Sequence, residues 1–138
     1  MPLNEKEIRT IFTEKTLIEL FPADRSDLFF EALFGEAEEG AFDISLTFKG
    51  IGDHKLNFDL LLNQRPGKCL ACNLTYGLPE VFLRHPIIDI KGLVENIGKL
   101  LEGLALCDTW QLERTRELSR EQHVVPLTIS VSDKQQHR

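Results

Sequence analysis

The chain contains little cysteine, tryptophan, tyrosine or methionine. Its 138 residues include three cysteines, one tryptophan, one tyrosine and one methionine. An odd number of cysteines does not suit a secreted disulfide framework, and it indicates reduced thiols in a cytoplasmic protein. No run approaches the roughly 20 apolar residues of a membrane span, and polar residues 4–7 stand where a signal peptide would become apolar. We therefore expect a cytoplasmic protein without a membrane segment.

A basic surface is also missing. Residues 1–64 carry 6 basic and 13 acidic side chains, and residues 65–138 carry 10 and 9, which together give the net charge of −6. Phosphate contacts dominate the affinity of nucleic-acid binders, so these proteins usually show a basic patch or stripe. We expect no nucleic-acid partner.

The clearest positive signal is a pair of alternating segments, in which apolar and polar residues follow one another with a period of two. Such a pattern is typical of half-buried β-strands. The apolar positions are Phe42, Ile44, Leu46 and Phe48 in the first segment and Leu56, Phe58, Leu60 and Leu62 in the second. Gly50, Gly52 and Asp53 lie between them and favour a turn. The sequence predicts a β-hairpin.

Helices are predicted before and after this hairpin. Apolar residues at helical spacing indicate a first helix that begins near Asn4 and ends before Pro22. A second helix is predicted from Ser26, as its N-cap, to Gly35, as its C-cap. A third amphipathic helix extends from Ile90 to about Gly103.

The remaining elements are strands. Residues 69–76 alternate as a third strand after the hairpin, and residues 123–131 alternate as a final strand, which Pro126 places at a sheet edge. Residues 110–122 fit either a strand paired with the last one or a helix. We favour the strand, because Leu112 and Leu118 share no helical face.

This order of elements predicts an α+β fold. Two N-terminal helices precede three strands, and a further helix separates these from the last two strands. The strands form one antiparallel sheet, and the helices pack on one face of it. We expect residues 1–131 to form a single domain and residues 132–138 to be a disordered C-terminal tail. The element order and the acidity resemble those of the small acidic chaperones of type III secretion. The resemblance includes no residue motif and assigns no family.

One segment, residues 65–86, concentrates side chains that a ligand site would need. The candidate ligand-binding residues are Arg65, Lys68, Tyr76, Arg84 and His85. Arginine offers a planar fork of donors to a carboxylate or phosphate, and histidine titrates near neutral pH. The chain has no Walker A, G-x-G-x-x-G, H-E-x-x-H or G-x-S-x-G pattern, so we assign no catalytic residue and no cofactor.

Cys69 and Cys72 form a C-x-x-C pair, which occurs in redox and zinc sites. Residues three apart on a strand face opposite sides, so the two thiols cannot chelate one ion together. We expect structural thiols and no metal.

Seven of the nine phenylalanines lie within the first 48 residues, on the acidic half of the chain. The second predicted helix is apolar around most of its circumference and needs covering on more than one side. We therefore expect a non-catalytic binding module that forms a homodimer through Phe29, Phe30, Leu33 and Phe34. The alternative is a small-molecule receptor or enzyme that uses residues 65–86 and keeps a pocket for an anionic or apolar ligand.

Overall fold

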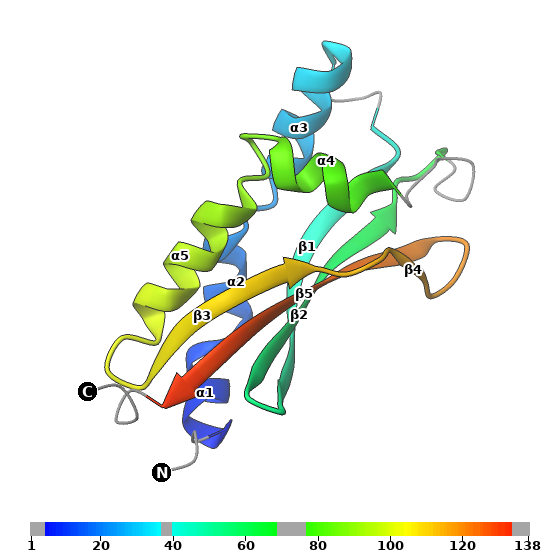
Figure 1. Cartoon of the computed structure of the whole chain (residues 1–138). Helices are drawn as coiled ribbons and strands as arrows, with labels where there is room; N and C mark the ends of the chain where they lie inside the picture. The colour runs from blue at the N-terminus through cyan, green and yellow to red at the C-terminus, as the bar shows by residue number, and fades with distance from the viewer. Residues whose placement is uncertain (1–4, 37–39, 69–76, 134–138) are drawn as a thin grey trace.

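The computed structural model describes residues 5–36, 40–68 and 77–133. Helices and strands alternate in blocks, and the fold is α+β, as predicted (Figure 1). The helices are α1 (Glu5–Ile11), α2 (Glu14–Leu20), α3 (Arg25–Phe34), α4 (Leu78–Arg84) and α5 (Ile90–Leu100). The strands are β1 (Phe42–Gly52), β2 (Lys55–Gln64), β3 (Ala105–Leu112), β4 (Arg116–Glu117) and β5 (Gln122–Asp133).

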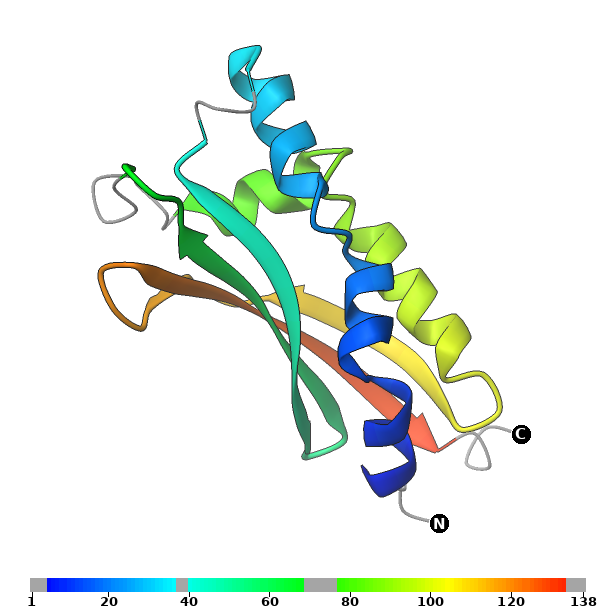
Figure 2. The ribbon, with the colours of Figure 1, turned by 180° about the vertical axis from the view of Figure 1, so that it is seen from behind.

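The described strands form one antiparallel sheet in the order β1-β2-β5-β3, with β4 also paired to β5. The helices cover one face of this sheet, as Figures 1 and 2 show from opposite sides. The other face carries no helix in the described part of the chain. This one-sided arrangement confirms the predicted packing.

The predicted hairpin is confirmed, including which side chains face the core. Phe42 pairs with Gln64 and Phe48 with Phe58, and the apolar positions of both strands point toward the helices. The turn differs from the prediction, because β1 continues through Gly50 and Gly52 with a register shift after Phe48. The chain reverses instead at residues 53 and 54, both of which have positive φ, the backbone of a tight two-residue hairpin turn.

The prediction that Pro126 marks an edge strand is wrong, because β5 lies between β2 and β3. Pro126 pairs with Asp59 on one side, and on the other its carbonyl accepts from the Glu113 amide at 2.8 Å. The N and O of one strand residue point to the same side, so the proline nitrogen faces Glu113, the residue that follows β3. Pro126 therefore lies where the ladder between β5 and β3 ends.

The strand interpretation of residues 110–122 is confirmed in part of the segment. β3 begins earlier, at Ala105, and both β3 and β4 pair with β5. A register shift between Cys107 and Trp110 keeps both side chains turned toward the core across the irregularity. β5 itself extends to Asp133, beyond the predicted end of the domain at Val131.

The N-terminal helix differs from the prediction, because it is divided into α1 and α2. Thr13 is the N-cap of α2, and its side chain accepts a hydrogen bond from the Thr16 amide at 3.2 Å. This local bond gives the backbone an alternative to continuing the helix. Ile8 of α1, Phe12 in the break and Leu20 of α2 are all buried in the core.

Helix α3 matches the predicted second helix, and Gly35 ends it in the left-handed conformation. Ser26 is not the N-cap, which is Asp24. The Ser26 hydroxyl is instead fully buried and accepts from the Ile44 amide of β1 at 2.7 Å. This contact attaches the helix to the edge of the sheet.

The sequence interpretation missed helix α4, whose signal is a proline in the first turn of the helix. The predicted third strand, residues 69–76, lies outside the described residues. Helix α5 is confirmed, with Ile90, Leu93 and Ile97 buried, and Gly103 follows it with positive φ. None of the helices in the described ranges is long and apolar enough to cross a membrane.

Candidate functional site

The predicted ligand residue Arg65 has a structural role. Its guanidinium bonds to Asp27 of α3 at 2.7 Å and to Asp43 of β1 at 2.9 Å. It also lies over the ring of Phe30, 5.2 Å from the centroid. Arg65 therefore ties the end of β2 to the helix layer and to the neighbouring strand.

The other predicted ligand residues do not join it. Lys68 is exposed in the turn after β2, and its amide donates to the Arg65 carbonyl. Arg84 is exposed and pairs with Glu80 one helical turn away. His85 ends α4, where its ring meets Phe29 edge-on and its Nδ1 accepts from the Ile87 amide. Tyr76 lies outside the described residues.

The predicted interface residues separate into two groups. Phe29 and Phe30 are buried, with 0% and 4% of their surface exposed, so neither can contact a partner in this conformation. Leu33 and Phe34 are 46% and 59% exposed, and Leu28 on the same helix is 46% exposed. The apolar surface of α3 is therefore smaller than predicted and is shifted toward the C-terminal end of the helix.

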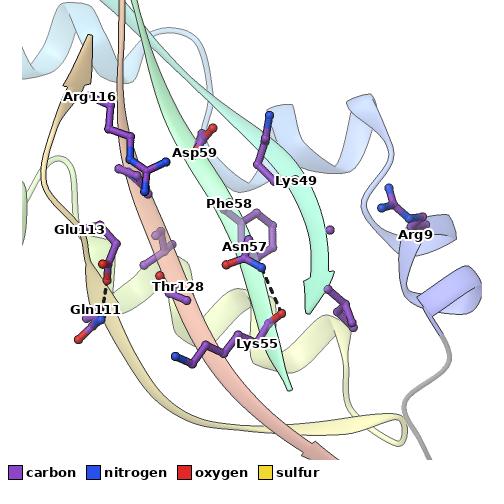
Figure 3. Close-up of a pocket in the computed structure, with 14 residues that line it drawn as sticks. Arg9, Lys49, Lys55, Asn57, Phe58, Asp59, Gln111, Glu113, Arg116 and Thr128 are labelled. Atoms are coloured by element: carbon purple, nitrogen blue, oxygen red, sulfur yellow. Dashed lines mark hydrogen bonds between the residues drawn. The ribbon is translucent and has the colours of Figure 1, made fainter. Parts of the chain in front are cut away.

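The uncovered face of the sheet contains a polar groove of about 520 Å³, which the sequence interpretation did not predict (Figure 3). We call this hollow the open-face groove. Its polar lining comes from β1, β2, β3, β4 and β5, from the residue that follows β3 and from one residue of α1. These side chains are Arg9, Lys49, Lys55, Asn57, Asp59, Gln111, Glu113, Arg116 and Thr128.

The charges within the open-face groove influence one another. Partial burial raises the pKa of Asp59 above its usual value, although the nearby Lys49 and Arg116 act in the opposite direction. Glu113 accepts a hydrogen bond from the side chain of Gln111. Among the described residues, neither Lys49 nor Arg116 forms an ion pair, so both cations remain available to a bound group.

The thiols show no sign of a shared site in the described part of the chain. Cys107 is half-buried in β3 and lines a hollow of about 360 Å³ between that strand and α5. Burial, and to a smaller degree Asp108, raises the pKa of its thiol. Cys69 and Cys72 lie outside the described residues, and within the described ranges no three metal-ligating side chains form a cluster.

The open-face groove had a signal in the sequence. Asn57 and Asp59 occupy the polar positions of an alternating strand, and side chains at these positions point away from the core. Sequence alone could not show that Thr128 lies beside them, because β5 enters the sheet between β2 and β3.

Comparison of the chain with protein-family models, with curated proteins and with solved structures finds no match. The functional inferences that follow therefore rest on the geometry of this chain alone.

Proposed function

We propose that this protein is a non-catalytic interaction module that forms a homodimer through the exposed end of α3. The observation that carries this proposal is an apolar stripe that continues beyond the core. Leu33 lies one helical turn after Phe29, and Phe34 lies one turn after Phe30. The first residue of each pair is buried and the second is exposed.

The position of α3 explains this change. In both overall views, the C-terminal end of α3 projects beyond the sheet (Figures 1 and 2). The ring of Phe34 stacks on that of Phe30 at 6.0 Å with an interplanar angle of 6°. This contact holds the exposed ring in a defined orientation, which lowers the entropy lost when a partner covers it.

Helix α4 adds apolar surface at the same end of the molecule. It packs on α3 through Phe82, whose ring meets Phe29 edge-on at 5.8 Å. On either side of Phe82, Val81 and Leu83 are 36% and 49% exposed. Acidic Glu31 of α3 is exposed near this surface, so the apolar side chains have a charged neighbour, as at the rim of an interface.

The expected free energy of dimerisation is small. Burying a large apolar side chain contributes about 1.5–3 kcal/mol, so two or three such residues per subunit can offset the several kcal/mol lost in association. A small interface of this kind predicts a dimer that dissociates on dilution.

The experiment compares two charge substitutions by light scattering across a range of concentrations. Phe34→Asp places a carboxylate in the proposed interface and is expected to give a monomer. Leu118→Asp is the matched control, because Leu118 is 60% exposed in the hairpin between β4 and β5. Equal masses for the two variants at every concentration would contradict the proposal. Unfolding measurements on both variants show whether each remains folded.

Catalysis by residues 65–86 has less support. Arg65 is committed to two carboxylates, and Arg84 and His85 have separate partners on or near α4. A ligand site that needs these side chains together would require the ion pairs of Arg65 to break.

A further inference from the structure

The open-face groove is cationic on a protein whose net charge is −6. Lys49, Lys55 and Arg116 line it from three strands, together with two carboxylates, Asp59 and Glu113. In Figure 3, Arg116 extends over β5 beside Asp59, while Lys55 extends across the same strand from the other end of the groove. Arg9 lies apart from them, beyond β1 (Figure 3), and stacks over Phe48.

The charge of Asp59 interacts with Lys49 and Arg116, but it does not form an ion-pair contact with either side chain. Within the described ranges, none of Lys49, Lys55 and Arg116 forms an ion pair. Other cations of the chain do form such pairs, as Arg65 and Arg84 show. The groove therefore offers unused positive charge, which suits an anionic group.

The acidic and uncharged polar residues of the groove indicate that a ligand must offer hydrogen-bonding groups as well as a negative charge. Asp59 and Glu113 would repel a ligand that is anionic throughout, but carboxylate oxygens accept hydrogen bonds from hydroxyl groups. Asn57, Gln111 and Thr128 can both donate and accept. Such a surface suits a molecule with one anionic group and several hydroxyls.

We propose that the open-face groove binds a small polyhydroxylated anion, such as a sugar phosphate or a sugar acid. The anionic group pairs with Arg116 and Lys49, which flank Asp59, and the hydroxyls bond to Asp59, Asn57 and Thr128. The volume of about 520 Å³ accommodates a molecule of this size. The site lies on the face opposite the helices, so it is separate from the proposed dimer surface on α3.

The test is a titration of isotope-labelled protein followed by amide chemical shifts at constant ionic strength. The probes are glucose 6-phosphate, gluconate, glucose and inorganic phosphate. Saturable shifts are expected with one or both hydroxylated anions, at amides of β2, β5 and the segment from Gln111 to Arg116. Comparison of the first two probes identifies the preferred anionic group, and weaker binding is expected for glucose and for inorganic phosphate.

Two substitutions in the groove test the assigned contacts, and a third substitution outside the groove is the control. Arg116→Ala is expected to weaken binding of the preferred probe by about tenfold or more, since it removes a charge-assisted hydrogen bond. Arg84→Ala removes the same charge from an exposed helix position outside the groove and is expected to leave the affinity unchanged. Asp59→Asn is expected to tighten binding at neutral pH, because a repulsive charge is lost while hydrogen-bonding capacity remains.

Three results would overturn the proposal. The first is the absence of saturable shifts with both hydroxylated anions at millimolar concentration. The second is an equal loss of affinity in the Arg116 and Arg84 variants, which would indicate general attraction of anions. The third is inorganic phosphate binding as tightly as glucose 6-phosphate and gluconate, which would show that the hydroxyls contribute nothing.

Discussion

Replacement of Phe58 by alanine is expected to destabilise the fold by about 3–5 kcal/mol, the range for deleting a buried aromatic side chain. Phe58 is 1% exposed and lies on β2 beneath the helices. Its ring meets Phe12 edge-on at 5.1 Å and lies 5.1 Å from the ring of Phe48. The substitution thus removes one ring of a cluster of three mutually contacting rings that joins the α1–α2 break to β1 and β2.

The size of this effect follows from two contributions. Transfer of the ring to water costs about 1.5–3 kcal/mol, and each aromatic pair adds about 0.5–1.5 kcal/mol. The surroundings can relax only in part, because Leu60 and Leu127 beside the cavity are themselves fully buried.

Denaturant unfolding measures the change at a dilution at which the proposed dimer dissociates, with Phe34→Ala as the control. Phe34 loses the same atoms but is 59% exposed and contacts only the Phe30 ring among the described aromatic rings. We expect the control to change the free energy of unfolding by less than about 1 kcal/mol. A comparably small change for Phe58→Ala would refute the assignment of the inward face of β2.

Three further predictions concern single polar or thiol groups. Ser26→Ala leaves the buried Ile44 amide without its side-chain acceptor, so it should cost about 1–3 kcal/mol in chemical unfolding, whereas the exposed Ser45→Ala should be nearly neutral. Burial raises the pKa of Asp59, so the folded chain holds this proton more tightly than the unfolded chain, and stability is lost as the pH rises through the raised pKa. Asp59→Asn should therefore have a higher melting temperature than the unmodified protein at pH 7 and the same one below the usual pKa of aspartate; a lower value at pH 7 would contradict this sign. Burial also raises the pKa of Cys107, so less of its thiol is ionised at pH 8 in the folded protein. Peptide mapping should therefore show slower alkylation of Cys107 by iodoacetamide in the folded than in the unfolded protein. Equal rates would contradict this prediction and show that the thiol is accessible.

The sequence predicted those parts of the fold in which local pattern and tertiary packing agree. The alternation around Phe58 determined both the strand and its inward face, and Gly35 marked the end of α3 correctly. The predictions that failed concern residues whose local sequence signal was overridden by contacts with distant parts of the chain. Ser26 resembled an N-cap but bonds to another element, and Pro126 resembled an edge residue but lies in a central strand, where the β3 ladder ends.

The candidate site was harder to predict for a similar reason. Clustering along the chain suggested that Arg65 and Arg84 act together, yet Arg65 pairs with Asp27 and Asp43 of two distant elements, whereas Arg84 pairs with Glu80 within α4. The predicted interface residues Phe29 and Phe30 are core residues. The residues of the open-face groove are distributed from Arg9 to Thr128 along the chain. Only the sheet order brings them together, and that order is set by long-range strand pairing that no local pattern encodes.

Sedimentation equilibrium of the unmodified chain tests the central claim, self-association through α3, most directly. Each chain has a mass of 15.8 kDa. The homodimer proposal predicts a weight-average mass that rises with concentration from this value toward twice this value. A mass that stays at 15.8 kDa up to the highest accessible concentration would contradict it.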